Sequence, residues 1–193
     1  MVDNGGFKIG GIAASTYGVT LMYAPGQPML PDTRDREIDI LGRSGQYWTD
    51  SDAGIRMFSL PCMFDGSADA AALETLIRAF AVIFVDEDGR SKLLDLEFDD
   101  APGLIYSVRY AGQIPFDRAW IGCSEFTLNL IADDPYAYQV DEEYDYESIT
   151  TSPGTMTVTS DGNVSTPAIL CVENTGGASI TGGFSVKIQY EVD

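Results

Sequence analysis

Neighbouring carboxylates are the residues of this sequence whose type best suits catalysis. Asp99–Asp100 and Glu142–Glu143 each supply the two acids that a carboxylate-pair hydrolase requires. Adjacent residues of a strand, however, point to opposite faces of its sheet, so neither pair can flank one scissile bond. We therefore predict no hydrolase site at either position.

The sequence contains no histidine among its 193 residues. This removes Ser-His-Asp and Cys-His nucleophilic sites, histidine-ligated metals and the commonest general base. No glycine-rich phosphate-binding pattern occurs, and Gly42-Arg43-Ser44-Gly45 lacks the Gly-x-Ser-x-Gly spacing of a nucleophile elbow. We predict that the protein is not an enzyme and that it has no catalytic residues, no cofactor and no bound metal.

Grouped acids raise the alternative of a calcium site, because carboxylates suit a hard cation. In residues 136–146 four tyrosines stand among acids, which also fits a solvated linker or a strand whose tyrosines pack while its carboxylates face water. In Asp86-Glu87-Asp88-Gly89 the glycine occupies position 4, and not position 6, of an EF-hand loop. A tight turn is the better interpretation of that second segment.

The three cysteines, Cys62, Cys123 and Cys171, lie far apart in the sequence and form no Cys-x-x-Cys motif. We expect free thiols in a reducing compartment, and a disulfide between two of them stays open.

The chain is strongly acidic, with a formal net charge of −19. Residues 119–193 contain one base, Lys187, against twelve acids. Scarce lysine and arginine argue against binding to nucleic acid or to an anionic membrane surface. We interpret the charge as favouring solubility and mutual repulsion of free monomers. No apolar run approaches the ~18 residues that a membrane span requires, and no signal-peptide pattern is present. We therefore expect synthesis in the cytoplasm without secretion by that route.

One amphipathic helix is predicted at about residues 67–80, with Ser67 as its N-cap. The apolar residues at helical spacing are Leu73, Leu76, Ile77 and Phe80. The continuous apolar run at 81–85 predicts a buried strand that is closed by the turn at 86–89.

Alternating patterns predict strands around this helix. They lie within 7–23, where a second strand begins near Val19, and at 55–63, 92–98, 104–110 and 122–132. Residues 113–120 are expected to be irregular, and Pro61 to mark a bulge or an edge. A single helix among strands must bury its apolar face against a sheet. The predicted fold class is therefore α+β, mainly β: an antiparallel sandwich or barrel-like domain with one packed helix.

Residues 34–47 are predicted to form a long hairpin that follows a proline-rich loop. Exposed strands of this kind are completed by a neighbouring chain. The candidate subunit-interface residues are Arg34, Arg36, Ile38, Ile40, Arg43, Tyr47 and Trp48.

Residues 148–193 are rich in Ser, Thr and Gly and predict about three short strands. So small a β segment seldom folds alone, and we expect it to lean on the first domain or on a partner. The predicted domains are 1–140 and a short β-rich segment at 141–193.

Several motifs occur in an order and spacing that resemble the N-terminal domain of siphophage distal tail proteins. They are Tyr17-Gly18-Val19, the residues 36–40 with 42–45, the helix at 70–80, Tyr106-Ser107-Val108-Arg109-Tyr110, and residues 126–130 with Asp133-Asp134-Pro135-Tyr136. The resemblance covers the first 140 residues.

This resemblance implies a structural virion protein that forms a hexameric ring at the distal end of a phage tail tube. The ring would connect the tube to the tail tip, hub, fibre or other receptor-binding apparatus. DNA would pass through its lumen without specific binding. The net charge of −19 adds the hypothesis that acidic surfaces line the channel and keep DNA from adhering. The family also carries a galectin-like sandwich, for which the segment from Ser148 onward is too short. We therefore expect a reduced module in that segment. We expect the protein as a whole at the tail tip of the virion.

Two other classes stay open. One is another tail component, such as a tube or terminator subunit. The other is a β-sandwich carbohydrate-binding module in which Tyr47, Trp48, Tyr136 and Tyr138 serve as sugar platforms.

Overall fold

The computed structural model describes residues 6–22, 28–64, 69–120, 123–140, 144–151, 153–159, 162–164, 169–177 and 185–187, with the side chains of 116–120 left out. The chain divides into two compact units, Met1–Glu143 and Tyr144–Asp193. Each is considered separately below.

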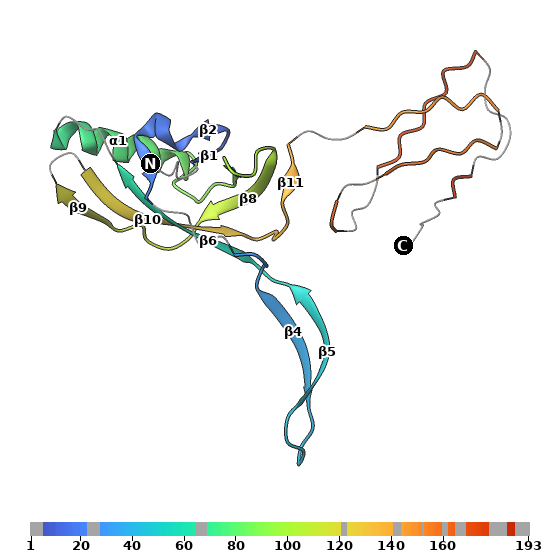
Figure 1. Cartoon of the computed structure of the whole chain (residues 1–193), viewed down its shortest axis with the longest axis horizontal. Coiled ribbons are helices and arrows are strands. Elements are labelled where there is room, and N and C mark those ends of the chain that lie inside the picture. Colours follow the sequence, from blue (N-terminus) through green and yellow to red (C-terminus); the bar gives the residue numbers. More distant parts are fainter. Residues whose placement is uncertain are drawn as a thin grey trace. The chain divides into compact units, whose positions relative to one another are not determined.

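The first unit is mainly β (Figure 1). Its described strands are β1 (Phe7–Ile9), β2 (Ile12–Ala13), β3 (Val19–Leu21), β4 (Thr33–Asp39), β5 (Gln46–Ala53), β6 (Arg56–Phe64), β7 (Leu94–Phe98), β8 (Leu104–Tyr110), β9 (Phe116–Trp120), β10 (Cys123–Ala132) and β11 (Tyr138–Gln139). Its described helices are the 3-10 turn η1 (Ala14–Tyr17) and the α-helix α1 (Ala70–Ile83).

Nine of these strands form one antiparallel sheet in the order β2-β1-β7-β8-β10-β6-β3, with β11 added to β8 and β9 added to β10. Strands β8 and β10 are paired only at Tyr110–Leu130 and Arg109–Ile131, so the sheet has two halves joined by a short seam. The ring of Phe58 on β6 lies 5.0 Å from that of Tyr106 on β8, measured between centroids. The two halves therefore face each other across a core, which confirms the predicted mainly β, barrel-like fold.

Helix α1 covers this core with the apolar stripe that its sequence predicted. Leu73 and Phe80 are buried, and the Phe80 ring meets Phe64 of β6 at 5.9 Å and Phe126 of β10 at 6.0 Å. Tyr17 of η1 packs on Phe80 from another side, at 5.9 Å. Phe80 thus joins the helix to three other elements.

The ends of the helix differ from the prediction. Asp69, and not Ser67, is the N-cap, because its carboxylate accepts hydrogen bonds from the backbone N–H groups of Ala71 and Ala72 at 2.9 and 2.8 Å. The strand expected at 81–85 is wrong, since the helix continues to Ile83. A continuous apolar run fits either element, and here Phe84 packs on Phe80 one turn earlier, at 5.1 Å.

Two further local predictions change. Residues 116–120, expected to be irregular, form β9 because β10 offers a free edge for pairing. Pro61 is not a bulge, since β6 and β10 stay in register through it. Its carbonyl accepts from the N–H of Met22 at 3.0 Å, just where the β3–β6 ladder ends, so the missing proline N–H breaks no continuing ladder.

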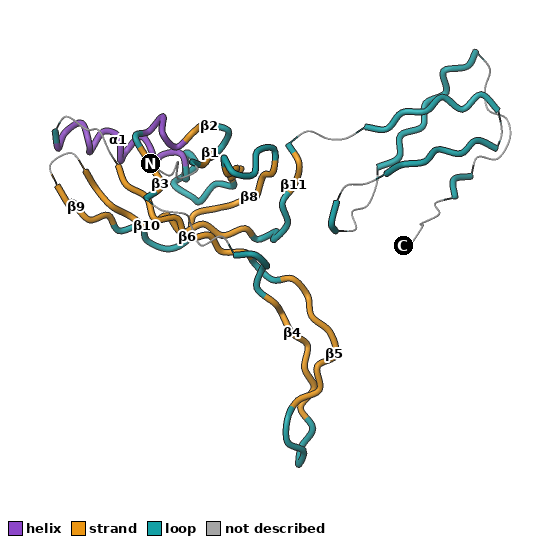
Figure 2. The backbone as a smooth tube through the Cα atoms, viewed as in Figure 1, coloured by secondary structure: helices purple, strands orange, loops and turns teal. Residues whose placement is uncertain are grey.

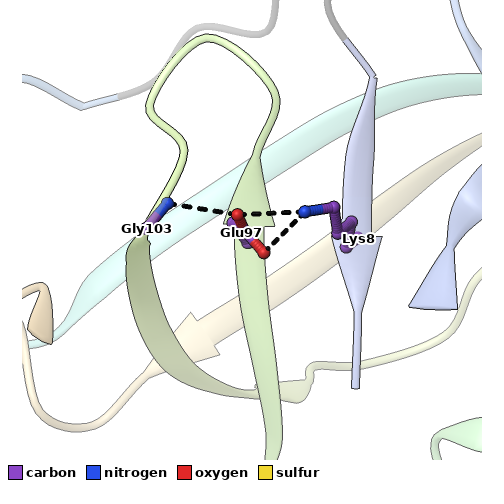
Figure 3. A network of polar contacts seen from close by, with 3 residues as sticks. All are labelled: Lys8, Glu97 and Gly103. Carbon is purple, nitrogen blue, oxygen red and sulfur yellow. Dashed lines mark hydrogen bonds and ion pairs between the residues drawn. The ribbon is translucent and has the colours of Figure 1, made fainter. Parts of the chain in front are cut away.

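A partly buried polar junction ties the N-terminal strand to the sheet (Figure 3). Lys8 of β1 donates to both carboxylate oxygens of Glu97 on β7, at 3.1 and 3.0 Å. The N–H of Gly103 donates to the same carboxylate at 3.1 Å. These bonds lower the pKa of Glu97, the Gly103 bond most strongly. The junction therefore joins β1, β7 and the turn that precedes β8.

The described residues of the second unit, Tyr144–Asp193, are not assigned to any strand. Each of the three strands expected there also includes residues outside the described ranges. That expectation therefore stays a prediction.

Candidate assembly surface

The most exposed part of the first unit is a two-stranded ribbon, β4 and β5, which we call the arm (residues 33–53). The two strands pair with each other and form a sheet separate from the nine-stranded one (Figure 2). Every residue from 32 to 50 is exposed. An isolated two-stranded ribbon is only marginally stable in water, so an arm of this length is suited to a partner surface.

The local sequence explains why this segment forms a ribbon. Gly42 and Gly45 adopt positive φ angles of 85° and 86°, which turn the chain between the strands at little steric cost. The N–H of Arg43 donates to the carbonyl of Ile40 at 3.1 Å and closes the turn. Isoleucine, tyrosine, tryptophan and threonine in the strands favour extended backbone.

The pairing register gives the arm two chemically different faces, because residues directly opposite each other share a face. One, which we call the arginine face, carries Arg34, Arg36, Ile38, Tyr47, Asp50 and Asp52. The other, which we call the tryptophan face, carries Asp35, Glu37, Asp39, Gln46, Trp48 and Ser51. The tryptophan face therefore has three acids and no base, whereas the arginine face has equal numbers of both charges.

Large apolar groups on the arm are exposed to solvent. The exposed fraction is 54% for Ile38, 42% for Tyr47 and 64% for Trp48, and Leu41 in the turn is fully exposed. Exposed aromatic and aliphatic side chains in one element are typical of interaction sites.

Two contacts organise the arginine face. Arg36 forms an ion pair with Asp52 across the ribbon. The guanidinium of Arg43 lies over the ring of Tyr47, 4.3 Å from its centroid. Both contacts hold long side chains in fixed directions, which lowers the entropy that a docking partner would remove.

The seven interface residues that the sequence predicted all lie on or at the end of the arm, and their roles stay a prediction. Six of them share the arginine face or the turn that follows it. Trp48 is separated from these six because it pairs with Glu37 on the tryptophan face.

The sequence missed a contact next to the base of the arm. Arg56, the first residue of β6, donates from Nη1 to the hydroxyl of Tyr106 on β8 at 2.8 Å. Both residues stand in alternating strand patterns, and nothing in their spacing signals the contact. A distance of fifty positions separates them along the chain.

The other candidate chemistries are not brought together. Asp99 and Asp100 lie in the exposed turn after β7, and Glu142–Glu143 lie outside the described residues. Tyr47 and Trp48 occupy opposite faces of the arm. Tyr138 belongs to β11, paired with β8, and donates its hydroxyl to Asp134 at 2.7 Å, which raises the pKa of Tyr138. The four aromatic side chains do not form a single sugar platform.

The acidic turn at 86–89 is held by its own hydrogen bonds. The carboxylate of Asp86 accepts from the N–H groups of Asp88 and Arg90 at 3.0 and 2.7 Å, and Gly89 has a φ of 75°. This is the tight turn that the sequence predicted. Within the described ranges, histidine, cysteine and acidic side chains form no group of three that would hold a metal. No helix in that part of the chain has both the length and the apolar character needed to cross a membrane.

Comparison with known proteins relates the chain to a protein family and to solved structures. The family model described as phage tail protein RIFT-related domain matches residues 13–132. Among solved structures, the chain is similar to the Dit (gp 19.1) protein of phage SPP1, described as a paradigm of the hub adsorption apparatus in phages that infect Gram-positive bacteria. That match has a TM-score of 0.58 at 17% identity and covers 70% of this chain and 52% of the SPP1 chain. A comparison with curated proteins found no match.

Proposed function

Because the chain belongs to the family of phage tail proteins with a RIFT-related domain, we propose that its first unit forms a hexameric ring at the distal end of the tail tube. The ring connects the tube protein on one side to the tail tip, hub or fibre proteins on the other. The protein is thus a structural component of the virion. The observation that carries this proposal is the exposure of apolar and charged side chains along the arm, which suits contact with a partner surface.

The occupant of the arm is a second copy of the same chain. A head-to-tail contact, in which the arm of one copy docks on the body of the next, closes into a ring when its rotation closes. Each copy adds the same arm and the same docking surface, so no edge is left open in the finished ring. The paired edges are then protected from non-specific association.

Charge selects the arginine face for this contact. The chain has a net charge of −19, so the body of a neighbouring copy repels the three acids of the tryptophan face. The arginine face places Ile38 and Tyr47 beside Arg34 and Arg36, and its own two aspartates balance those arginines. Apolar burial there proceeds without a like-charge penalty.

The same acidity suits a channel for DNA. Carboxylates around the lumen repel phosphate groups and prevent the adhesion that a basic lining would produce. A ring whose lumen is neutral or basic, with its acids on the outside, would contradict this part of the proposal.

The ring is tested by measuring particle mass and imaging the purified full chain by negative-stain microscopy. We expect discrete particles of about six copies, in keeping with closed cyclic symmetry. Labelling of the virion with an antibody should mark the distal end of the tail. Labelling along the tube or at its head-proximal end would instead favour a tube or terminator subunit.

The two faces of the arm provide a matched pair of variants. Ile38→Ser with Tyr47→Ser should leave single copies at concentrations where the unchanged protein forms rings. Trp48→Ser, on the opposite face, should leave the rings intact. All these side chains are exposed, so circular dichroism should show the same fold in each variant. Loss of rings with Trp48→Ser alone would contradict the choice of face, and a wild-type chain that stays single would contradict the ring.

A further inference from the structure

The junction between the arm and the body contains an arginine whose contacts reach both. We propose that Arg56 is a positioning residue that fixes the direction in which the arm leaves the body, by bridging the arm base to Tyr106. The inference rests on the proposed function, in which the arm must meet a neighbouring copy. It concerns how the arm is aimed, and not which surface the arm meets.

The backbone hydrogen bonds at the base of the arm close the ribbon but do not fix its direction relative to the body. The N–H of Asp32 donates to the carbonyl of Ile55 at 3.1 Å, and the N–H of Gly54 donates to the carbonyl of Asp32 at 2.7 Å. Both bonds join the residue just before β4 to the residues just after β5. A ribbon tied only to itself can swing about the residues that connect it to β6, namely 54 and 55.

Arg56 supplies the missing connection to the body. Its guanidinium donates to the Tyr106 hydroxyl at 2.8 Å and lies 5.2 Å from the centroid of the same ring. Its Nη2 reaches the carbonyl of Met29, at 3.5 Å, in the segment that precedes β4. One side chain therefore contacts β8 of the body and the segment leading into β4.

Tyr106 is a fixed point because its ring packs into the core. The ring lies 5.0 Å from Phe58, whose ring lies 5.8 Å from Phe98. Phe58 and Phe98 are both buried. A hydrogen bond to the Tyr106 hydroxyl thus connects the base of the arm to a side chain that is held by the core.

One atom of the Arg56 side chain is enclosed at this junction. Its Nε is buried and has no hydrogen-bond partner among the described residues, which carries a desolvation cost. A planar guanidinium can satisfy acceptors in two directions at once, whereas a lysine ammonium on a flexible stem cannot hold the same fork. Arg56→Lys should keep the positive charge but no longer fix the direction of the arm.

The direction of the arm can be measured in single copies, without assembly. Spin labels are placed at Ser44→Cys in the arm turn and Ala79→Cys on the exposed side of α1, in a background with Cys123→Ser and Cys171→Ser. Electron–electron distance measurement should give one narrow distribution for this protein. Arg56→Lys and Tyr106→Phe should each broaden it. Tyr110→Phe is the matched control on the same strand and should leave it narrow.

Assembly gives the second readout. We expect Arg56→Lys and Tyr106→Phe to raise the concentration needed for rings about tenfold, the scale of one charge-assisted hydrogen bond. Distributions as narrow as that of the parent protein would overturn the role of Arg56. Broadened distributions in a protein that never forms rings would support Arg56 and contradict the proposed ring. A third outcome would contradict only the role of Arg56. In it, the double variant Ile38→Ser with Tyr47→Ser loses the rings, whereas Arg56→Lys keeps both the rings and a narrow distance distribution.

Discussion

The hydroxyl of Thr49 donates a hydrogen bond to the backbone carbonyl of Arg36 across the arm, at 2.7 Å. Thr49 is the extra residue of a β-bulge, because Arg36 pairs with Asp50 while Glu37 pairs with Trp48. The extra residue shifts the alternation of side chains by one. Asp50 and Asp52 thereby join the arginines, where strict alternation would have added them to the three acids of the opposite face.

Deletion of Thr49 tests what the bulge contributes. The strand pairs on either side are kept, so Arg36 and Asp52 stay on one face and the arm stays folded. Bulges bend and twist a ribbon, so the deletion should straighten the arm and move its tip. We expect a shifted but narrow distance between labels at positions 44 and 79, together with weakened ring formation. An unchanged distance would show that the bulge sets only the phase of the side chains.

Phe80→Ala should be strongly destabilising. The ring contacts Tyr17, Phe64, Phe84 and Phe126, and its loss leaves a cavity between the helix and strands β6 and β10. The expected loss in free energy of unfolding is about 3–5 kcal/mol, measured by urea denaturation. Val82→Ala, at an exposed position of the same helix, is the control and should change stability little. Equal effects of the two substitutions would contradict the packing of α1.

Glu97→Gln should remove a pH-dependent part of the stability. Hydrogen bonds from Gly103 and Lys8 lower the pKa of Glu97 in the folded protein, so the carboxylate contributes fully above its unfolded pKa. That contribution is lost as the pH falls through the unfolded value and on to the lower folded one. The difference in unfolding free energy between the parent protein and Glu97→Gln should therefore shrink from pH 7 toward pH 3.

This comparison needs the variant because the whole chain is acidic. Protonating the other carboxylates relieves repulsion as the pH falls, so the stability of the parent protein alone would mix opposing effects. Asp95→Asn, an exposed neighbour on β7, is a suitable control. A difference for Glu97→Gln that stays constant or grows toward acid would contradict the junction.

The thiols should differ in reactivity. Burial raises the pKa of Cys62 to about 12, so at pH 8 its sulfur is protonated as well as inaccessible. Cys171 is exposed. Alkylation of the native protein with iodoacetamide, followed by peptide mass analysis, should modify Cys171 rapidly and Cys62 only after denaturation. Rapid modification of native Cys62 would show that β6 is not buried as described.

Local patterns in the sequence determined the type and order of most elements. Leu73 and Phe80 at helical spacing specified one buried helical face, and strict alternation in residues 123–132 specified a half-buried strand. Glycine at 42 and 45 specified the turn of the arm, because these positions take positive φ. The absence of histidine from the sequence led us to predict no Ser-His-Asp or Cys-His site. These features depend on neighbours within about two helical turns, which the sequence contains.

Tertiary structure decided the features that depend on distant partners. Residues 116–120 form a strand because they pair with the edge of β10. The helix continues to Ile83 because Phe84, its C-cap, packs on Phe80 in the core. Side-chain direction along a strand reverses with every inserted residue, so only the pairing of β4 with β5 showed that Trp48 faces away from Ile38. The contact of Arg56 with Tyr106 likewise exists only where the arm meets the folded body, because no local pattern links residues fifty positions apart.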